Sequence, residues 1–167
     1  MNSLLTFDFT VDKENKTIIV KREFAAELPL VWDAFTKKEI LDQWWAPKPW
    51  KSQTKVMEFT EGGTRLYAMV GPQGEEHWAT FSYEKIEMHK RFTGFDGFTD
   101  ANGILNPAMP RMHWDVRFRE KGMNSFVEIV ITLADLAQLE TMLAMGFQGG
   151  FTIGLNSLSE LLPTLKK

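Results

Sequence analysis

Hydrophobic and polar residues alternate in short stretches through most of the chain, with the period of two that is typical of half-buried β-strands. The alternation is cleanest from Met112 to Glu120, where Trp114, Val116 and Phe118 alternate with charged or polar neighbours. Because turn signals lie between closely spaced stretches, we expect an antiparallel meander of about six to seven strands. The predicted strands are residues 16–24, 52–59, 64–70, 77–87, 91–98, 112–120 and 125–133.

Two short helices are predicted after the first strand. Pro29 stands where the first turn of a helix tolerates proline, and apolar residues follow it at helical spacing. Thr36 followed by Glu39 has the form of a capping box, a motif that begins helices. We therefore expect a second helix to begin there and to end at Pro47.

The C-terminal segment predicts one long amphipathic helix. Asp135 with Gln138 resembles a capping box, and the helical pattern continues to about Leu162. Such a helix must pack on an apolar surface, and the apolar face of the sheet is the available partner. The positions predicted to share the buried arc are Leu136, Leu139, Leu143, Phe147, Phe151, Leu158 and Leu161.

These elements predict an α+β helix-grip fold over residues 1–167 as a single domain. A curved antiparallel sheet would hold the long C-terminal helix across its concave face. Gly150 and Gly154 fall inside the apolar arc of that helix, where large side chains are expected. Either they allow close packing or a kink at Gly149-Gly150, or their missing side chains leave a space for a ligand, flanked by Phe147 and Phe151.

Composition and charge narrow the function classes. Thirteen Phe, six Trp and two Tyr supply rigid side chains that can fill a core or line a cavity. The net charge of −3 gives no electrostatic reason to expect nucleic-acid binding. The chain contains no Cys, and no stretch approaches the ~20 apolar residues of a membrane span. We expect a cytoplasmic protein that does not bind nucleic acid and does not span a membrane.

No signature of catalysis or of metal and cofactor binding is present. The spacing of His77, His89 and His113 matches no metal-binding pattern. A nucleophile elbow, a phosphate-binding glycine loop and a dinucleotide fingerprint are also absent. The sequence therefore predicts no catalytic residue, no metal ligand and no cofactor.

The sequence leaves two interpretations open for the position of several residues. Arg65 and Glu58 flank the Gly62-Gly63 turn. Arg65 either points into a cavity, where it pairs with Glu58 or binds an acidic ligand group, or forms an exposed salt bridge at the rim. The three tryptophans around Pro47 either pack in the core or line a cavity mouth in part. The loop at residues 96–111 is a candidate lid or rim.

The assembled motifs resemble a known family. They are the segment Leu-Asp-Gln-Trp-Trp-Ala-Pro at 41–47, the Gly62-Gly63 turn, the strand and turn at 67–74, and the helix from Gly146. Together they resemble the SRPBCC (START-like, helix-grip) superfamily, and within it the homologues of the activator of heat-shock-protein-90 ATPase. The resemblance covers nearly the whole chain. It implies a helix-grip cavity but transfers no catalytic residue, since the superfamily serves transport, hormone binding, cyclisation and chaperone regulation alike.

The expected function is binding of a small hydrophobic or amphipathic molecule between the sheet and the C-terminal helix. One alternative is an enzyme of cyclase or hydrolase type, for which Glu58, Arg65, Tyr67, Tyr83 and His77 are the candidates. Another is a chaperone-regulating module that uses the outer sheet face or the 96–111 loop. A homodimer is compatible with each. The predicted cavity residues are Trp45, Arg65, Tyr67, Met69, Phe81, Tyr83, Trp114, Phe118, Phe147, Gly150, Phe151 and Gly154.

Overall fold

A single eight-stranded antiparallel sheet organises residues 5–165, the part of the chain that the computed structural model describes. The strands run in the order β1-β2-β8-β7-β6-β5-β4-β3, so that β3 to β8 form the predicted meander. The strands are β1 Phe7–Asp12, β2 Thr17–Phe24, β3 Lys51–Met57, β4 Thr64–Val70, β5 Glu76–Glu87, β6 Arg91–Thr99, β7 His113–Lys121 and β8 Asn124–Thr132. The helices are α1 Leu28–Thr36, α2 Lys38–Leu41, α3 Leu136–Ala144 and α4 Phe147–Leu165.

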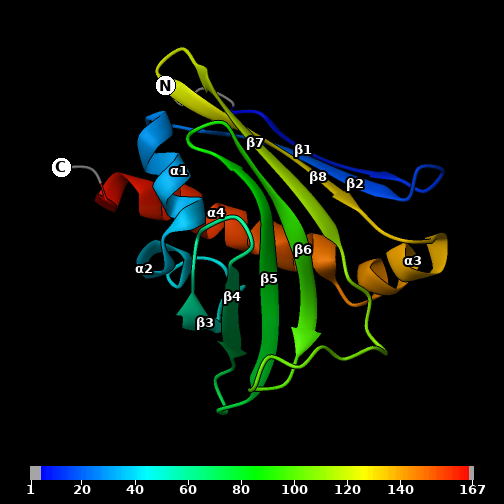
Figure 1. Ribbon diagram of the computed structural model, residues 1–167. Coiled ribbons are helices and arrows are strands. Elements are labelled where there is room, and N and C mark those ends of the chain that lie inside the picture. The colour runs from blue at the N-terminus through cyan, green and yellow to red at the C-terminus, as the bar shows by residue number, and fades with distance from the viewer. Residues whose placement is uncertain (1–4, 166–167) are drawn as a thin grey trace.

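The sheet curves around α4, which runs across the strands with α1 and α2 beside its C-terminal half (Figure 1). The α+β helix-grip architecture is therefore confirmed. Leu155, Leu158 and Leu162 on the sheet-facing side of α4 are almost completely buried. Leu136, by contrast, is 41% exposed at the start of α3, so it lies outside the predicted buried arc.

One strand, β1, was not predicted from the sequence. It pairs only with β2 at the edge of the sheet, where Phe7 is exposed and Phe9 and Val11 are half-buried. The turn to β2 is held by Asp12, whose carboxylate accepts hydrogen bonds from the backbone and the side chain of Asn15. The sequence of β1 alternates apolar and polar residues at all six positions, so the period-two signal of a strand was present there.

The predicted single C-terminal helix is wrong, because it is interrupted at Gly146. Asp135 does cap the first part, since its side chain accepts a 2.8 Å hydrogen bond from the backbone N–H of Gln138. Gly146 then adopts a φ of +88°, a left-handed conformation that ends α3 before α4 begins. The chain therefore changes direction at Gly146 rather than bending at Gly149-Gly150.

The predicted capping box at Thr36 is also wrong. The Thr36 hydroxyl donates to the carbonyl oxygen of Trp32 within α1, at 2.8 Å, so it does not cap the next helix. The helix α2 follows Lys37 and contains only four residues. Trp44 and Trp45 consequently lie in the turn after α2. The Trp44 ring packs on Phe35 of α1, whereas the Trp45 ring packs on Trp114 of β7 and Phe151 of α4.

Within residues 5–165, no helix is long and apolar enough to cross a membrane. The longest, α4, has a polar exposed side that includes Gln148 and Asn156. This distribution fits a helix that is packed on one side by the sheet.

Two glycines at the α3–α4 junction give opposite predictions for alanine. Gly149 lies in α4, and an added Cβ would meet no atom within 4 Å, so Gly149→Ala should raise the free energy of unfolding by up to about 1 kcal/mol. Gly146→Ala should lower it by about 1 kcal/mol, because alanine disfavours the left-handed conformation. Urea denaturation of both variants tests this, and shifts of the same sign would contradict the assignment of the helix break.

Candidate functional site

Two neighbouring cavities lie between the sheet and the helices. The outer cavity has a volume of about 220 Å³ and the inner cavity a volume of about 40 Å³. Both are walled mainly by aromatic and aliphatic side chains. They share Trp45, Tyr67, Asp96 and Trp114, which therefore stand where the two cavities adjoin.

The strand register brings the polar groups of the site into one row on the concave face. Arg65 on β4 pairs with Phe81 on β5, and Phe81 pairs with Asp96 on β6. Side chains of directly paired residues lie on the same face of a sheet, so the Phe81 ring separates a guanidinium from a carboxylate. Gly94 makes room for that ring, since a Cβ there would lie 2.4 Å from it.

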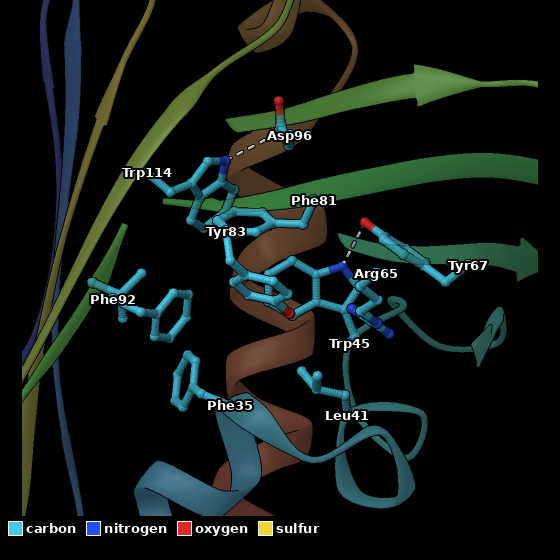
Figure 2. Close-up of a pocket in the computed structure, with 11 residues that line it drawn as sticks. Phe35, Leu41, Trp45, Arg65, Tyr67, Phe81, Tyr83, Phe92, Asp96 and Trp114 are labelled. Atoms are coloured by element: carbon cyan, nitrogen blue, oxygen red, sulfur yellow. Dashed lines mark hydrogen bonds between the residues drawn. The ribbon is translucent and has the colours of Figure 1, made fainter. Parts of the chain in front are cut away.

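Two indole rings at the junction of the cavities are fixed by hydrogen bonds (Figure 2). The Trp45 Nε1–H donates to the Tyr67 hydroxyl at 2.9 Å, and the Trp114 Nε1–H donates to Asp96 Oδ2 at 2.9 Å. The two ring centroids lie 5.8 Å apart. Because both rings are held at their polar edges, their apolar faces are presented to the cavities.

Arg65 is buried, which contradicts the reading of an exposed rim salt bridge. Its side chain is 3% exposed, and its Nη2 lies 3.3 Å from Asp42 Oδ1. The guanidinium also donates to the hydroxyls of Ser52 and Thr54, and it lies 4.0 Å from the centroid of the Tyr67 ring. Glu58, the expected partner, is exposed. Arg65 is thus held by Asp42, the residue that follows α2, and not by Glu58.

Asp96 is the polar site residue that was missing from the predicted cavity. It lines both cavities, and its Oδ1 accepts a 2.7 Å hydrogen bond from the backbone N–H of Met112. Burial raises the pKa of Asp96 to about 6, against the hydrogen bonds that favour the ionised form. The sequence contained the signal, because Asp96 shares the period-two face of its strand with Phe92 and Phe98.

The Tyr83 hydroxyl has no hydrogen-bond partner within the described part of the chain, although the residue is only 5% exposed. It lines the inner cavity, which has room for a water molecule or a small polar group. Burial raises the pKa of Tyr83 and of Tyr67, so both phenols are neutral near pH 7.

Ten of the twelve predicted cavity residues line one of the two cavities. Phe118 does not, because its ring packs in the core at 4.9 Å from that of Trp32. Gly154 does not either, since a Cβ there would lie 3.2 Å from the carbonyl oxygen of Trp44. Gly154 thus serves close packing, whereas Gly150 lines the outer cavity. The lining residues that were not predicted include Asp96, Phe98, Met112, Met142 and Met145.

The histidines do not converge. His77 lines the outer cavity, His89 lies in a turn with a φ of +64°, and the His113 Nε2 lies 2.8 Å from Glu84. Among residues 5–165, no three His, Asp or Glu side chains are placed to hold a metal ion. The loop expected as a lid contributes no residue between 99 and 111 to either cavity.

Comparison with known proteins gives a family match and a consistent fold. The family model described as Activator of Hsp90 ATPase homolog 1-like protein matches residues 25–163. No curated protein matches the chain.

Solved structures of three bacterial proteins are similar over nearly their whole length. Protein Ms6760 from Mycobacterium smegmatis is 25% identical, with a TM-score of 0.86 and coverage of 95% of this chain and 97% of that one. A protein from Arthrobacter aurescens is 25% identical, with a TM-score of 0.89 and coverage of 94% and 91%. A protein from Staphylococcus epidermidis is 27% identical, with a TM-score of 0.82 and coverage of 95% and 96%.

The two cavity tyrosines should differ in their contribution to stability. Tyr67→Phe removes the acceptor of the Trp45 indole N–H and should lower the free energy of unfolding by about 1 to 2 kcal/mol. Tyr83→Phe removes a hydroxyl without a protein partner and should change it by less than about 0.5 kcal/mol. Chemical denaturation followed by circular dichroism compares them. Equal losses of stability in the two variants would show that the Tyr83 hydroxyl also forms a hydrogen bond.

The buried ion pair gives a second prediction. Arg65→Met should lower the free energy of unfolding by about 3 kcal/mol, because it leaves the Asp42 carboxylate without its cation. Combining it with Asp42→Asn should recover part of the loss, since no uncompensated charge remains. Thermal denaturation of the single and double variants measures this coupling. A harmless Arg65→Met would contradict a structural role for the pair.

Proposed function

Because the chain belongs to the Activator of Hsp90 ATPase homolog 1-like family, we propose that it binds one small, mainly apolar molecule in the outer cavity. The observation that carries the proposal is a space of about 220 Å³ whose walls are largely aromatic and aliphatic. A few polar groups at one place in an apolar pocket are typical of small-molecule sites. Here those groups are Asp96, Tyr67 and His77.

The size of the cavity limits the ligand. Pockets for drug-sized molecules usually have volumes of about 300 to 1,000 Å³, so this cavity suits a compact ligand rather than a long-chain lipid. Rigid rings keep the space from collapsing: Phe147 and Phe151 stack with centroids 5.5 Å apart on one wall. Met142 and Met145 on the helical side are flexible enough to adapt to a ligand's shape.

The helix break supplies a means of entry in this proposal. Met145, Gly146, Phe147 and Gly150 all line the outer cavity, so the α3–α4 junction forms part of its wall. No atom lies within 4 Å of the Cβ position of Gly146, and Met145 is half exposed, so few contacts hold the junction in place. Its local movement would widen the cavity without disturbing the packed C-terminal half of α4.

The other functions considered have less support. Of the candidates for an enzymatic reaction, Glu58 is exposed and Arg65 is engaged with Asp42. Tyr67 and Tyr83 share the inner cavity with Arg65, and burial raises the pKa of both phenols. A homodimer and a chaperone partner remain predictions from the sequence.

A cavity-filling variant tests the proposal. The neutral fluorescent probe N-phenyl-1-naphthylamine should bind the wild-type protein saturably. Gly150→Leu should weaken binding by about tenfold or more, because the new side chain occupies the cavity. The helix should tolerate it, since the Gly150 Cβ position has only Pro47 Cγ within 4 Å, at 3.7 Å.

The matched control is Gly149→Leu, which places the same side chain one residue away, where a Cβ meets no atom within 4 Å. It should leave the affinity within about threefold of wild type. Fluorescence titration gives both values, and circular dichroism confirms that both variants fold. Absence of saturable binding to the wild type, or equal loss in both variants, would overturn the proposal.

A further inference from the structure

Asp96 is the one carboxylate among the residues that line either cavity. It is half-buried in β6, at the junction of the inner and outer cavities. An acidic group in largely apolar surroundings is unfavourable unless a cation or several hydrogen bonds compensate it. The groups that compensate the charge of Asp96 therefore indicate which kind of ligand group the cavity would favour.

The protein partners of the Asp96 carboxylate are both neutral. Oδ1 accepts from the backbone N–H of Met112, and Oδ2 accepts from the Trp114 indole N–H. A carboxylate oxygen can accept a second hydrogen bond, so each retains capacity. No salt bridge to Asp96 is formed within residues 5–165.

The nearby cations form no ion pair with the Asp96 carboxylate, although the charge of Arg111 lowers its pKa. Arg65, at the other end of the Arg65–Phe81–Asp96 row, is paired with Asp42. Arg111 is exposed, and its Nε donates to the backbone carbonyl of Asp96 at 2.8 Å rather than to the carboxylate. Its guanidinium carbon lies 5.5 Å from the centroid of the Phe95 ring. Because Phe95 and Asp96 are consecutive in a strand, they point to opposite faces of the sheet.

Aromatic rings line the cavity that Asp96 also lines. Trp114 is hydrogen-bonded to it, and Trp45, Tyr67 and Phe98 line the same outer cavity. The negative faces of such rings attract organic cations within about 6 Å of the ring centre. A carboxylate without an ion-pair partner, in a cavity lined by aromatic rings, is therefore complementary to an ammonium group and repels an anionic head group.

We propose that the molecule bound in the outer cavity is a small organic cation, a protonated amine on an apolar body, with its ammonium group at Asp96. The inference rests on the proposed function of the cavity and specifies its ligand class. The apolar body would lie against Phe147, Phe151 and Met142, and the ammonium group would donate to the free lone pairs of Asp96.

Three matched ligands test the inference. They are 1-naphthylmethylamine, 1-naphthalenemethanol and 1-naphthoate, which carry similar ring systems with a cationic, neutral and anionic group. Isothermal titration calorimetry near pH 7.5 should give an affinity for the amine about tenfold above that for the alcohol. The carboxylate should bind more weakly than the alcohol because Asp96 repels it.

Asp96→Asn should remove the preference for the amine, so that the variant binds the amine and the alcohol with affinities within about threefold of each other. Circular dichroism establishes that this variant folds.

A second experiment uses the wild-type protein and needs no substitution: the amine preference is measured as a function of pH. The amine preference should shrink as the pH falls from about 7.5 to about 4.5, because Asp96 takes up a proton near its raised pKa while the ligand remains charged.

The other groups that face this position are accounted for in the pH experiment. Burial raises the pKa of Tyr67, so its phenol stays neutral over this range. The guanidinium groups nearby belong to Arg65 and Arg111. His77 lines the same cavity and would repel an amine if it became charged. The titration is therefore repeated with His77→Gln, which should leave the pH dependence in place.

The possible results separate the cation inference from the proposed binding function. An amine that binds no tighter than the alcohol, or a preference that survives in Asp96→Asn, would overturn the cation inference and leave the binding function standing. If neither the three ligands nor N-phenyl-1-naphthylamine bind, the proposed function fails with it. A pH dependence that vanishes in His77→Gln would assign the titration to the histidine and contradict the role of Asp96.

Discussion

The close approach of α4 to the turn after α2 sets the shape of the whole site. At Gly154 the helix lies so near that a Cβ would be 3.2 Å from the Trp44 carbonyl oxygen and 3.4 Å from that of Trp45. The leucines of the following turns are buried against the sheet. The helix is thus held at its C-terminal half, whereas at Gly150 its nearest neighbour is Pro47 at 3.7 Å. The space under the N-terminal half of α4 follows from this unequal packing.

The walls around that space are rigid because the strand register places large side chains next to one another. Large rings project from adjacent strands onto the concave face, and a collapsed arrangement would require them to leave their rotamers. The indoles of Trp45 and Trp114 are also tied to Tyr67 and Asp96 by hydrogen bonds of 2.9 Å. Removal of either acceptor would leave a poorly hydrated indole N–H, so the bonds keep the ring faces oriented toward the cavities.

The fold was largely predictable because its signals are local, and the exceptions are instructive. Period-two alternation located the meander, and the cap at Asp135 is formed as predicted. The helix break at Gly146 was not found, because the hydrophobic period continues through it and only the backbone angle shows the change. The partner of Arg65 could not be inferred, since Asp42 is 23 residues away and meets it only through tertiary packing. Alternation places Asp96 on the cavity face of the predicted strand at 91–98, but that strand overlaps the predicted loop at 96–111 at this residue.

The family shares one architecture, so the chemistry of an individual member depends on a small number of polar groups in its cavity. Here the two charged residues of the row on the concave face have different roles. Arg65 is neutralised by Asp42, and its hydrogen bonds join α2, β3 and β4 into one unit. Asp96 accepts hydrogen bonds only from neutral donors and forms no ion pair within the described residues, although the charge of Arg111 lowers its pKa. A buried charge matched internally stabilises structure, whereas one left unmatched in an open cavity favours a ligand of opposite sign. The distinction between the two residues therefore lies in their partners and could not be read from residue type or burial alone.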